Sequence, residues 1–243
     1  MTVDEVNKAK QNPVSGLKSI YLQDVVLPVG SGNANSFSLQ PVYPFRINDK
    51  WKLITYTIIP IQSIPQVEPG TATGSGLGNI LFNGYFSPVY KEKRALVWGF
   101  GPAIQFPTRT NAALGSNRLS AGPAALLYLS GASLSGGVVA QNFWSFGGTG
   151  ANQVNLFSLQ YILFYNFPRG WYLESNASVT ANWLATSSDT WTVPVGGGPG
   201  KTFQIGKGKY FYSAALQGFY NAVRPDFVGN WMIIAQFQII FSM

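Results

Sequence analysis

Bulky apolar side chains alternate with small or polar ones along most of this chain, and this period of two constrains the fold more than any other feature. About twelve segments of roughly 10 to 15 residues show the pattern. In residues 171–183, Trp171 and Leu173 alternate with Glu174 and Asn176. Successive side chains of a β-strand point to opposite faces. The alternation therefore predicts strands with one apolar face and one polar face.

The composition indicates which solvent the apolar face meets. The chain is 46% hydrophobic and only 10% charged, whereas soluble domains carry roughly 25% charged residues. No apolar run approaches the roughly 18 to 20 residues of a membrane-spanning helix, and a closed barrel is the other structure that satisfies its backbone in lipid. We therefore predict an all-β, transmembrane, up-and-down antiparallel β-barrel of about 12 strands over residues 16–243. A soluble β-sandwich with a dry centre is the alternative.

Short and longer connections alternate between the predicted strands. The short ones include 47–50 and 168–170, and the longer ones include 61–76 and 108–117. Outer-membrane barrels have short periplasmic turns and longer extracellular loops. An even number of strands would then place both termini in the periplasm of a Gram-negative cell.

Aromatic residues are expected to form a belt at each membrane interface. We expect one belt at the extracellular rim and one at the periplasmic rim, with lipid and lipopolysaccharide of the outer membrane as partners. The predicted extracellular set is Trp144, Trp183, Trp191 and Trp231, and the periplasmic set is Trp51, Trp171 and Phe241. The net charge of +7 reflects basic residues at the short turns. These residues are either simply solvated, the preferred interpretation, or in contact with anionic headgroups.

Residues 1–15 form a separate polar segment. Thr2 and Glu5 have the spacing of a capping box, which predicts a short helix ending before Pro13. A periplasmic tail is the preferred interpretation, and a plug in the lumen is the alternative. No signal peptide is visible, although an exported protein needs one. We interpret the sequence as the mature region of an exported protein, although a cytosolic protein would look the same here.

The inward-facing side chains are mostly amides and hydroxyls with few charges. Such a lining suits a narrow path for neutral solutes or a closed interior held by hydrogen bonds, and barrels of intermediate strand number allow both. The residues expected to line the lumen are Gln40, Arg46, Gln105, Gln141, Gln160, Glu174, Asn176, Gln217, Gln236 and Gln238.

Several classes of function fit the sequence poorly. The chain has no Cys and no His, which removes thiolate chemistry and the Ser-His-Asp arrangement. The glycine-rich stretch 196–201 lacks the spacing and following helix of a phosphate loop. Its glycines more simply let a strand bend or admit a bulky neighbour. We predict no catalytic site, cofactor, metal or nucleic-acid partner.

Four stretches are similar to a family of Gram-negative outer-membrane barrels. They read "SGLGNILFNGYF", "WGFGPAIQFPTRT", "GWYLESNASVTANW" and "WTVPVGGGPGKTFQIGK". The chain resembles this family, named for the MetA pathway of phenol degradation or as neuromedin-U-like transporters, from about residue 15 to its end. The resemblance implies outer-membrane location and passage of small, often aromatic, compounds. It also implies that the barrel-insertion machinery reads the C-terminal strand, although here residues 242–243 follow Phe241.

Two functions remain open at this point. The first is a channel for passive transport of small neutral or weakly polar solutes, with aromatic and hydrophobic compounds as candidates. The second is a non-conducting structural or surface-interaction barrel whose contact site is the loop 61–76.

Overall fold

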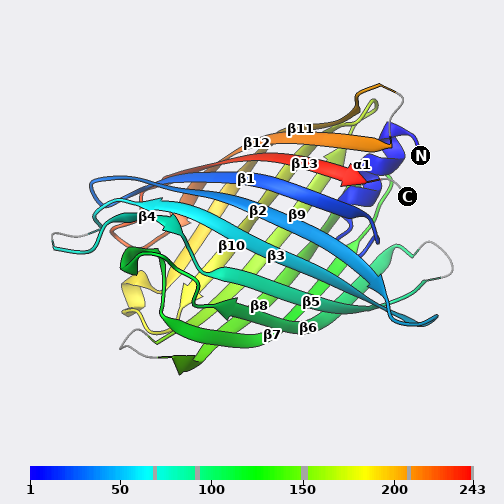
Figure 1. Ribbon diagram of the computed structural model, residues 1–243. Helices are drawn as coiled ribbons and strands as arrows, with labels where there is room; N and C mark the ends of the chain where they lie inside the picture. The colour runs from blue at the N-terminus through cyan, green and yellow to red at the C-terminus, as the bar shows by residue number, and fades with distance from the viewer. Residues whose placement is uncertain (68–69, 91–93, 149–152, 207–208, 242–243) are drawn as a thin grey trace.

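The computed structural model describes residues 1–67, 70–90, 94–148, 153–206 and 209–241. In this part of the chain twelve long antiparallel strands form a closed barrel (Figure 1). The long strands are β1 (Lys18–Val29), β2 (Gly32–Arg46), β3 (Trp51–Ile64), β5 (Ile80–Pro88), β6 (Leu96–Phe106), β7 (Arg118–Leu129), β8 (Leu134–Gly148), β9 (Asn155–Asn166), β10 (Trp171–Asn182), β11 (Trp191–Gln204), β12 (Tyr210–Val223) and β13 (Trp231–Phe241). The short elements are α1 (Val3–Gln11), β4 (Gly74–Leu77), η1 (Ala112–Leu114) and η2 (Ser187–Asp189).

The barrel closes between its first and last strands. β1 pairs with β13 from Lys18 opposite Phe241 to Val26 opposite Ile233, and every other long strand pairs with its neighbour in sequence. β4 pairs with β3 on the same edge as β5 and continues the line of β5 toward the long-loop end. The prediction of an all-β, up-and-down barrel of about twelve strands is confirmed. A two-sheet sandwich is excluded because the strands form one continuous sheet.

The two ends of the barrel differ in their connections. The short-turn end carries residues 47–50, 130–133 and 167–170, and both described chain ends lie there (Figure 1). The long-loop end carries the longer connections, among them 107–117 and 183–190. One connection departs from this order: β1 and β2 are joined at the long-loop end by Gly30 and Ser31 alone. Gly30 has a φ of +54° there, a left-handed conformation that glycine adopts at no steric cost.

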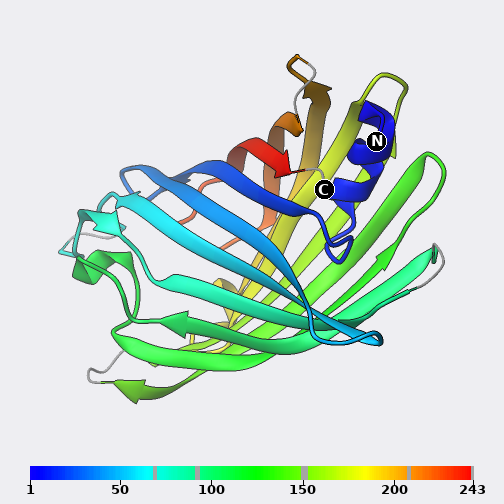
Figure 2. The same cartoon turned by 45° about the vertical axis from the view of Figure 1, so that its right-hand side comes forward.

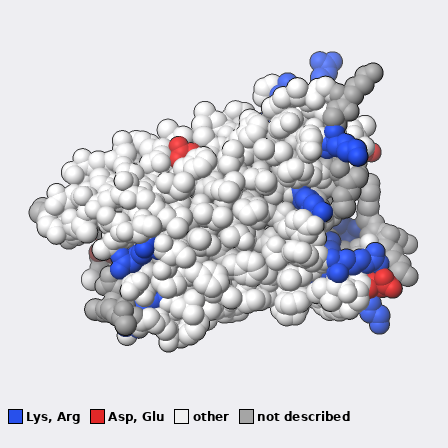
Figure 3. Space-filling view, viewed as in Figure 1, with Lys and Arg blue, Asp and Glu red and all other residues white. Residues whose placement is uncertain are grey.

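The distribution of side chains is inside out relative to a soluble protein. Phe100 is 52% exposed and Leu173 is 49% exposed on the outer face, whereas Gln40, Gln217 and Gln238 are no more than 3% exposed inside. Lysine, arginine and acidic side chains gather mainly near the two ends, leaving a broad uncharged band between them (Figure 3). This arrangement follows directly from the alternation in the sequence. Among the described residues, no helix is long and apolar enough to cross a membrane.

Candidate functional site

The N-terminal helix lies in the mouth of the barrel at the short-turn end (Figure 2). The capping box forms as predicted, because the Glu5 amide donates to the Thr2 hydroxyl and the Thr2 amide donates to the Glu5 carboxylate. The preferred interpretation of residues 1–15 as a free tail does not hold in this structure. Val6, Asn7 and Gln11 are at most 3% exposed, so the helix buries one face against the barrel.

Amide side chains join α1 to the inner wall. Asn7 Nδ2 donates to Asn166 Oδ1 over 2.9 Å, and Gln11 Nε2 donates to the same oxygen over 2.7 Å. The Thr202 hydroxyl donates to Asn7 Oδ1 over 2.8 Å. The contacts span β9 and β11, so the helix is tied to two strands. Buried hydrogen bonds of this kind are costly to leave unmade once formed.

The first turn of α1 supplies an apolar contact and an anchor. Val6 packs with Phe211 and Ile240 in a buried cluster. The Gly170 amide donates to Asp4 Oδ1 over 2.6 Å. Gly170 has a φ of +75°, and a Cβ there would lie 2.6 Å from Val3 Cγ1. The turn 167–170 is therefore shaped so that the helix can approach it closely.

Lys10 places a cation inside the lumen. Its Nζ lies 4.2 Å from the ring centroid of Tyr172 and 5.4 Å from that of Phe164. Glu174, 3% exposed, is the acidic group whose charge acts on Lys10. Asn176 Nδ2 donates to Glu174 Oε1 over 3.1 Å, while Glu174 Oε2 is buried without a hydrogen-bond partner. Burial lowers the pKa of Lys10 to about 8, and the charge of Glu174 acts in the opposite direction.

The docking of α1 should therefore depend on pH. Lys10 released into water regains its ordinary pKa of 10.5. Between pH 8 and 10.5 the undocked state then binds more protons, so raising the pH through this range strengthens docking, on the order of 2 kcal/mol. A spin label on Lys8→Cys, an exposed position of the helix, should lose mobility on going from pH 7.5 to 10. The same pH change should leave a Lys10→Met variant unaltered. Equal pH responses in both proteins would contradict this prediction.

Beyond the helix, described residues enclose two cavities in the lumen. The first, of about 240 Å³, lies between α1 and the middle of the barrel. The second has a volume of about 200 Å³ and is lined by residues nearer the long-loop end. Five side chains line both cavities and form what we call the amide belt: Gln23, Gln160, Asn176, Ser178 and Gln236. Gln160 Nε2 donates to Asn176 Oδ1 over 2.8 Å, which orients part of this belt.

The first cavity has two chemically different walls. The polar wall belongs to β13, β1 and β2, with Gln238, Gln23 and Gln40. The opposite wall, from β3, β5 and β7 to β9, carries most of the apolar lining: Ile54, Tyr85, Leu126, Val139, Ile162 and Phe164. It also carries Asn83, Gln141 and Gln160, and β10 adds Glu174, Asn176 and Ser178. The prediction that amides and hydroxyls form most of the lining of the lumen was therefore only half correct. The walls together can hold a molecule that has an apolar body and a polar edge.

Most of the residues predicted to line the lumen do line a cavity. Those on the wall of the first cavity are Gln40, Gln141, Gln160, Glu174, Asn176, Gln236 and Gln238, and Gln217 lines the second. Gln105 lines neither cavity. It is half-buried opposite Leu81 and Ser120, toward the long-loop end of β6.

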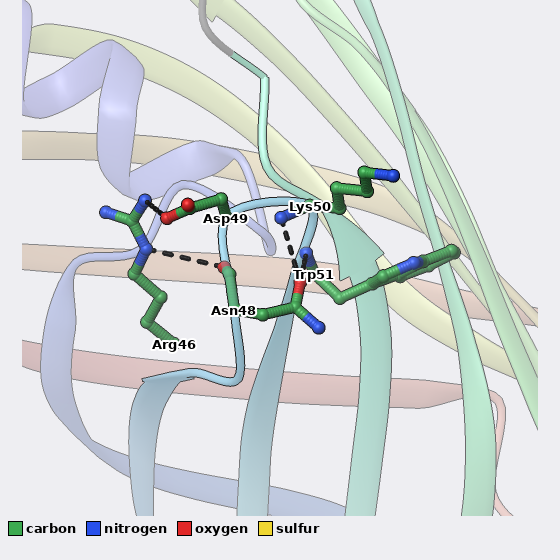
Figure 4. Close-up of polar contacts among 5 residues, drawn as sticks. All are labelled: Arg46, Asn48, Asp49, Lys50 and Trp51. Atoms are coloured by element: carbon green, nitrogen blue, oxygen red, sulfur yellow. Dashed lines mark hydrogen bonds and ion pairs between the residues drawn. The ribbon is translucent and has the colours of Figure 1, made fainter.

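Arg46 was wrongly expected in the lumen. It ends β2 at the short-turn end, where its side chain is 67% exposed and its Nη2 lies 2.7 Å from Asp49 Oδ1 (Figure 4). The Asn48 side chain accepts from the amides of Lys50 and Trp51 and orders the same turn. Arg46 has the inward parity of its strand, but β2 extends past the wall of the cavity at this end.

The predicted belt aromatics lie on the outer face near the two ends. At the long-loop end, Trp183 and Trp191 meet with ring centroids 5.4 Å apart, and Trp144 and Trp231 are 48% and 39% exposed. At the short-turn end, Trp171 is 47% exposed. The ring centroid of Trp51 lies 5.9 Å from that of Trp98, and the ring centroid of Phe241 lies 5.6 Å from that of Tyr210. Contact of these rings with headgroups stays a prediction. Residues 242–243 lie outside the described part of the chain.

Sequence reasoning missed Lys10 and the tyrosines of the lumen. Tyr21, Tyr56 and Tyr85 line the first cavity, and the Tyr56 hydroxyl donates to Gln40 Oε1. The inward direction of these tyrosines could have been predicted from the sequence. Tyr21, for example, is two residues from Gln23 and so has the same parity. Lys10 had no such signal, because its place depends on how α1 docks. Among the described residues, no three His, Cys, Asp or Glu side chains are grouped so as to hold a metal ion.

The fold is similar to that of solved outer-membrane channels. An outer membrane channel from Pseudomonas putida F1 has a TM-score of 0.66 and 15% identity over 93% of this chain and 94% of its own. The NanC porin has a TM-score of 0.56 and 8% identity over 93% of this chain and 100% of its own. No protein-family model and no curated protein sequence matches the chain. At these identities the likeness establishes the barrel fold.

Proposed function

We propose that this protein is an outer-membrane channel for passive transport of small neutral or weakly polar solutes, including aromatic ones. Its apolar outer band suits hydrocarbon, and the fold matches that of known outer membrane channels. In this proposal the short-turn end and both termini face the periplasm, and the aromatic rings contact lipid and lipopolysaccharide. The barrel-insertion machinery would read β13.

The observation that carries the proposal is the two-walled first cavity. A large water-filled pore usually carries rings of charge that set ion selectivity. Here the wall of β13, β1 and β2 presents neutral amides, and the opposite wall presents mainly aliphatic and aromatic side chains. The charged groups of the lining are Lys10 and Glu174. A flat aromatic molecule with one polar substituent can satisfy both walls at once. A fully charged solute would lose hydration that neutral amides only partly replace.

The docked helix favours a second candidate function, that of a non-conducting structural barrel. Because α1 lies across one mouth, the lumen could be closed under all conditions. Recording in planar bilayers distinguishes the two. The channel proposal expects steady ohmic steps and swelling of liposomes in small neutral solutes, and silence from correctly folded, heat-modifiable protein would overturn it.

Glu174 should influence which ions cross. It is the buried acidic side chain beside the first cavity and lies near the amide belt. Replacing it with the neutral isostere in Glu174→Gln should reduce any preference for cations, seen as a shift of the reversal potential in a salt gradient toward zero or toward anions. Asp49→Asn is the matched control, because Asp49 is 92% exposed in a turn outside the lumen. An unchanged reversal potential in Glu174→Gln would show that ions do not pass this carboxylate.

A further inference from the structure

The hydrogen-bonded ladder of the barrel wall is interrupted locally between β10 and β11. Pairing runs from Trp171 opposite Lys201 to Glu174 opposite Gly198, stops, and resumes in the same register at Thr180 opposite Thr192. Residues 175–179 and 193–197 therefore face each other without ladder pairs. We call this stretch the seam. The register is the same on both sides, so no residue is inserted. The strands stay side by side, because a Cβ at Gly197 would lie 3.2 Å from Ser175 Cβ.

No interruption of comparable length occurs in the other described ladders. Pairing is interrupted at Pro41, Pro102, Pro123 and Pro199, but each of these gaps omits only two residue pairs. Proline lacks an amide hydrogen, which explains a short gap. The seam omits five pairs and contains one proline, Pro194. Its length therefore needs more than the chemistry of proline.

Side chains, in place of the ladder, bond to backbone groups along the seam. The Tyr161 hydroxyl of β9 reaches across β10 and donates to the Pro194 carbonyl over 2.9 Å. The Ser175 hydroxyl donates to the Gly196 carbonyl. The backbone amide of Asn176 donates to Gln217 Oε1 over 3.0 Å. Side-chain bonds can exchange by rotation about single bonds, whereas a ladder opens only when its strands move apart.

The second cavity lies directly behind the seam. Its wall includes Ala177, Ser178 and Pro194 from the two strands of the seam. Phe219 and Ile234, which have the inward parity of β12 and β13, form one buried cluster with Ala177, and Tyr161, which has the outward parity of β9, packs on it. Side-chain contacts, and not ladder hydrogen bonds, therefore join the two strands at this point.

We propose that the seam is a lateral exit from the lumen, through which small apolar molecules pass sideways from the second cavity into the hydrocarbon of the membrane. The inference rests on the proposed channel function and adds a route to it. Phe219 and Tyr161 close the exit in this structure. An apolar solute that leaves sideways never has to pass the amide belt or the docked helix. Ions cannot use this route, because it opens into hydrocarbon.

A reversible cross-link across the seam tests the proposal. Cβ atoms at Ser175 and Gly197 would lie 3.2 Å apart, somewhat less than the roughly 3.5 to 4.5 Å of a disulfide, and the chain has no other cysteine. A Cβ at Gly197 would also lie 2.5 Å from the Glu174 carbonyl oxygen, so the backbone must shift slightly. Cells with intact lipopolysaccharide that produce Ser175→Cys/Gly197→Cys should take up radiolabelled naphthalene on the order of tenfold more slowly when oxidised than when reduced. The control Leu159→Cys/Val179→Cys bridges the intact β9–β10 ladder and should show no redox effect. Potassium chloride conductance in bilayers should be equal in both redox states.

A second variant keeps the proposal testable if the disulfide distorts the barrel. Phe219→Ala removes the ring that seals the seam, so naphthalene uptake should rise severalfold while ion conductance stays unchanged. Phe143→Ala, buried on the opposite wall, is its control. Equal uptake by locked and reduced protein, both above cells without the protein, would overturn the lateral exit alone. Uptake no higher than in cells without the protein would overturn the proposed channel function as well.

Discussion

Deleting residues 2–12 is expected to raise the single-channel conductance on the order of fivefold, because the helix occupies the mouth of the lumen at the short-turn end. α1 buries Val6, Asn7 and Gln11 inside the mouth, and its Lys10 reaches the wall of the first cavity. Without the helix, this cavity opens directly to solvent at the short-turn end. Planar-bilayer recordings of the full-length and shortened proteins, purified and refolded in parallel, measure the effect.

Point variants separate loss of the helix from loss of its docking. Val6→Asp puts a charge into the cluster of Val6, Phe211 and Ile240, where Val6 is 0% exposed. Burying an unpaired charge is costly, so this variant should conduct like the deletion. Lys8→Ala changes an exposed position of the same helix and should conduct like the unmodified protein. Equal conductance in all four proteins would mean that α1 does not restrict the path.

A charge in the middle of the outer face is expected to have the largest effect on stability. Leu216 is 57% exposed at the centre of β12, opposite Ala235 of β13. If this face meets hydrocarbon, Leu216→Arg should lower the free energy of unfolding by roughly 2 to 4 kcal/mol. Reversible urea unfolding in lipid vesicles, followed by tryptophan fluorescence, measures the change. In a soluble protein, an exposed leucine replaced by arginine would alter stability by no more than about 0.5 kcal/mol.

The chain offers a matched control at the edge of the same face. Leu129 is 56% exposed and is the last residue of β7, near the expected interface. Leu129→Arg should cost only about 0 to 1 kcal/mol, because an arginine there reaches water and headgroups. The difference between two leucines of equal exposure reports depth in the bilayer. Equal costs at both positions would contradict a membrane-embedded outer band.

The alternation of apolar and polar side chains along each strand determined the fold. Each strand carries its own solvent preference on alternate residues, as Leu173 and Glu174 illustrate, so the inward and outward sets can be assigned one strand at a time. That is why Gln40, Gln160 and Gln238 were placed correctly on the inner face. The prediction for Arg46 was wrong because the parity of a residue gives the face to which its side chain points, and not its position along the barrel axis. The strand of Arg46 continues beyond the wall of the cavity.

The features that decide function depend on contacts between distant parts of the chain. Asn7 meets Thr202, and Lys10 faces Glu174, only because the helix folds back into the mouth. The seam requires the β10–β11 ladder to be interrupted while the register is kept, and the sequence of either strand alone does not predict this. The sequence by itself thus determined which faces meet hydrocarbon and which line the lumen, because that choice is local. Only the tertiary structure decided what closes the lumen and where the ladder of its wall is interrupted, because those contacts join residues with no common local pattern.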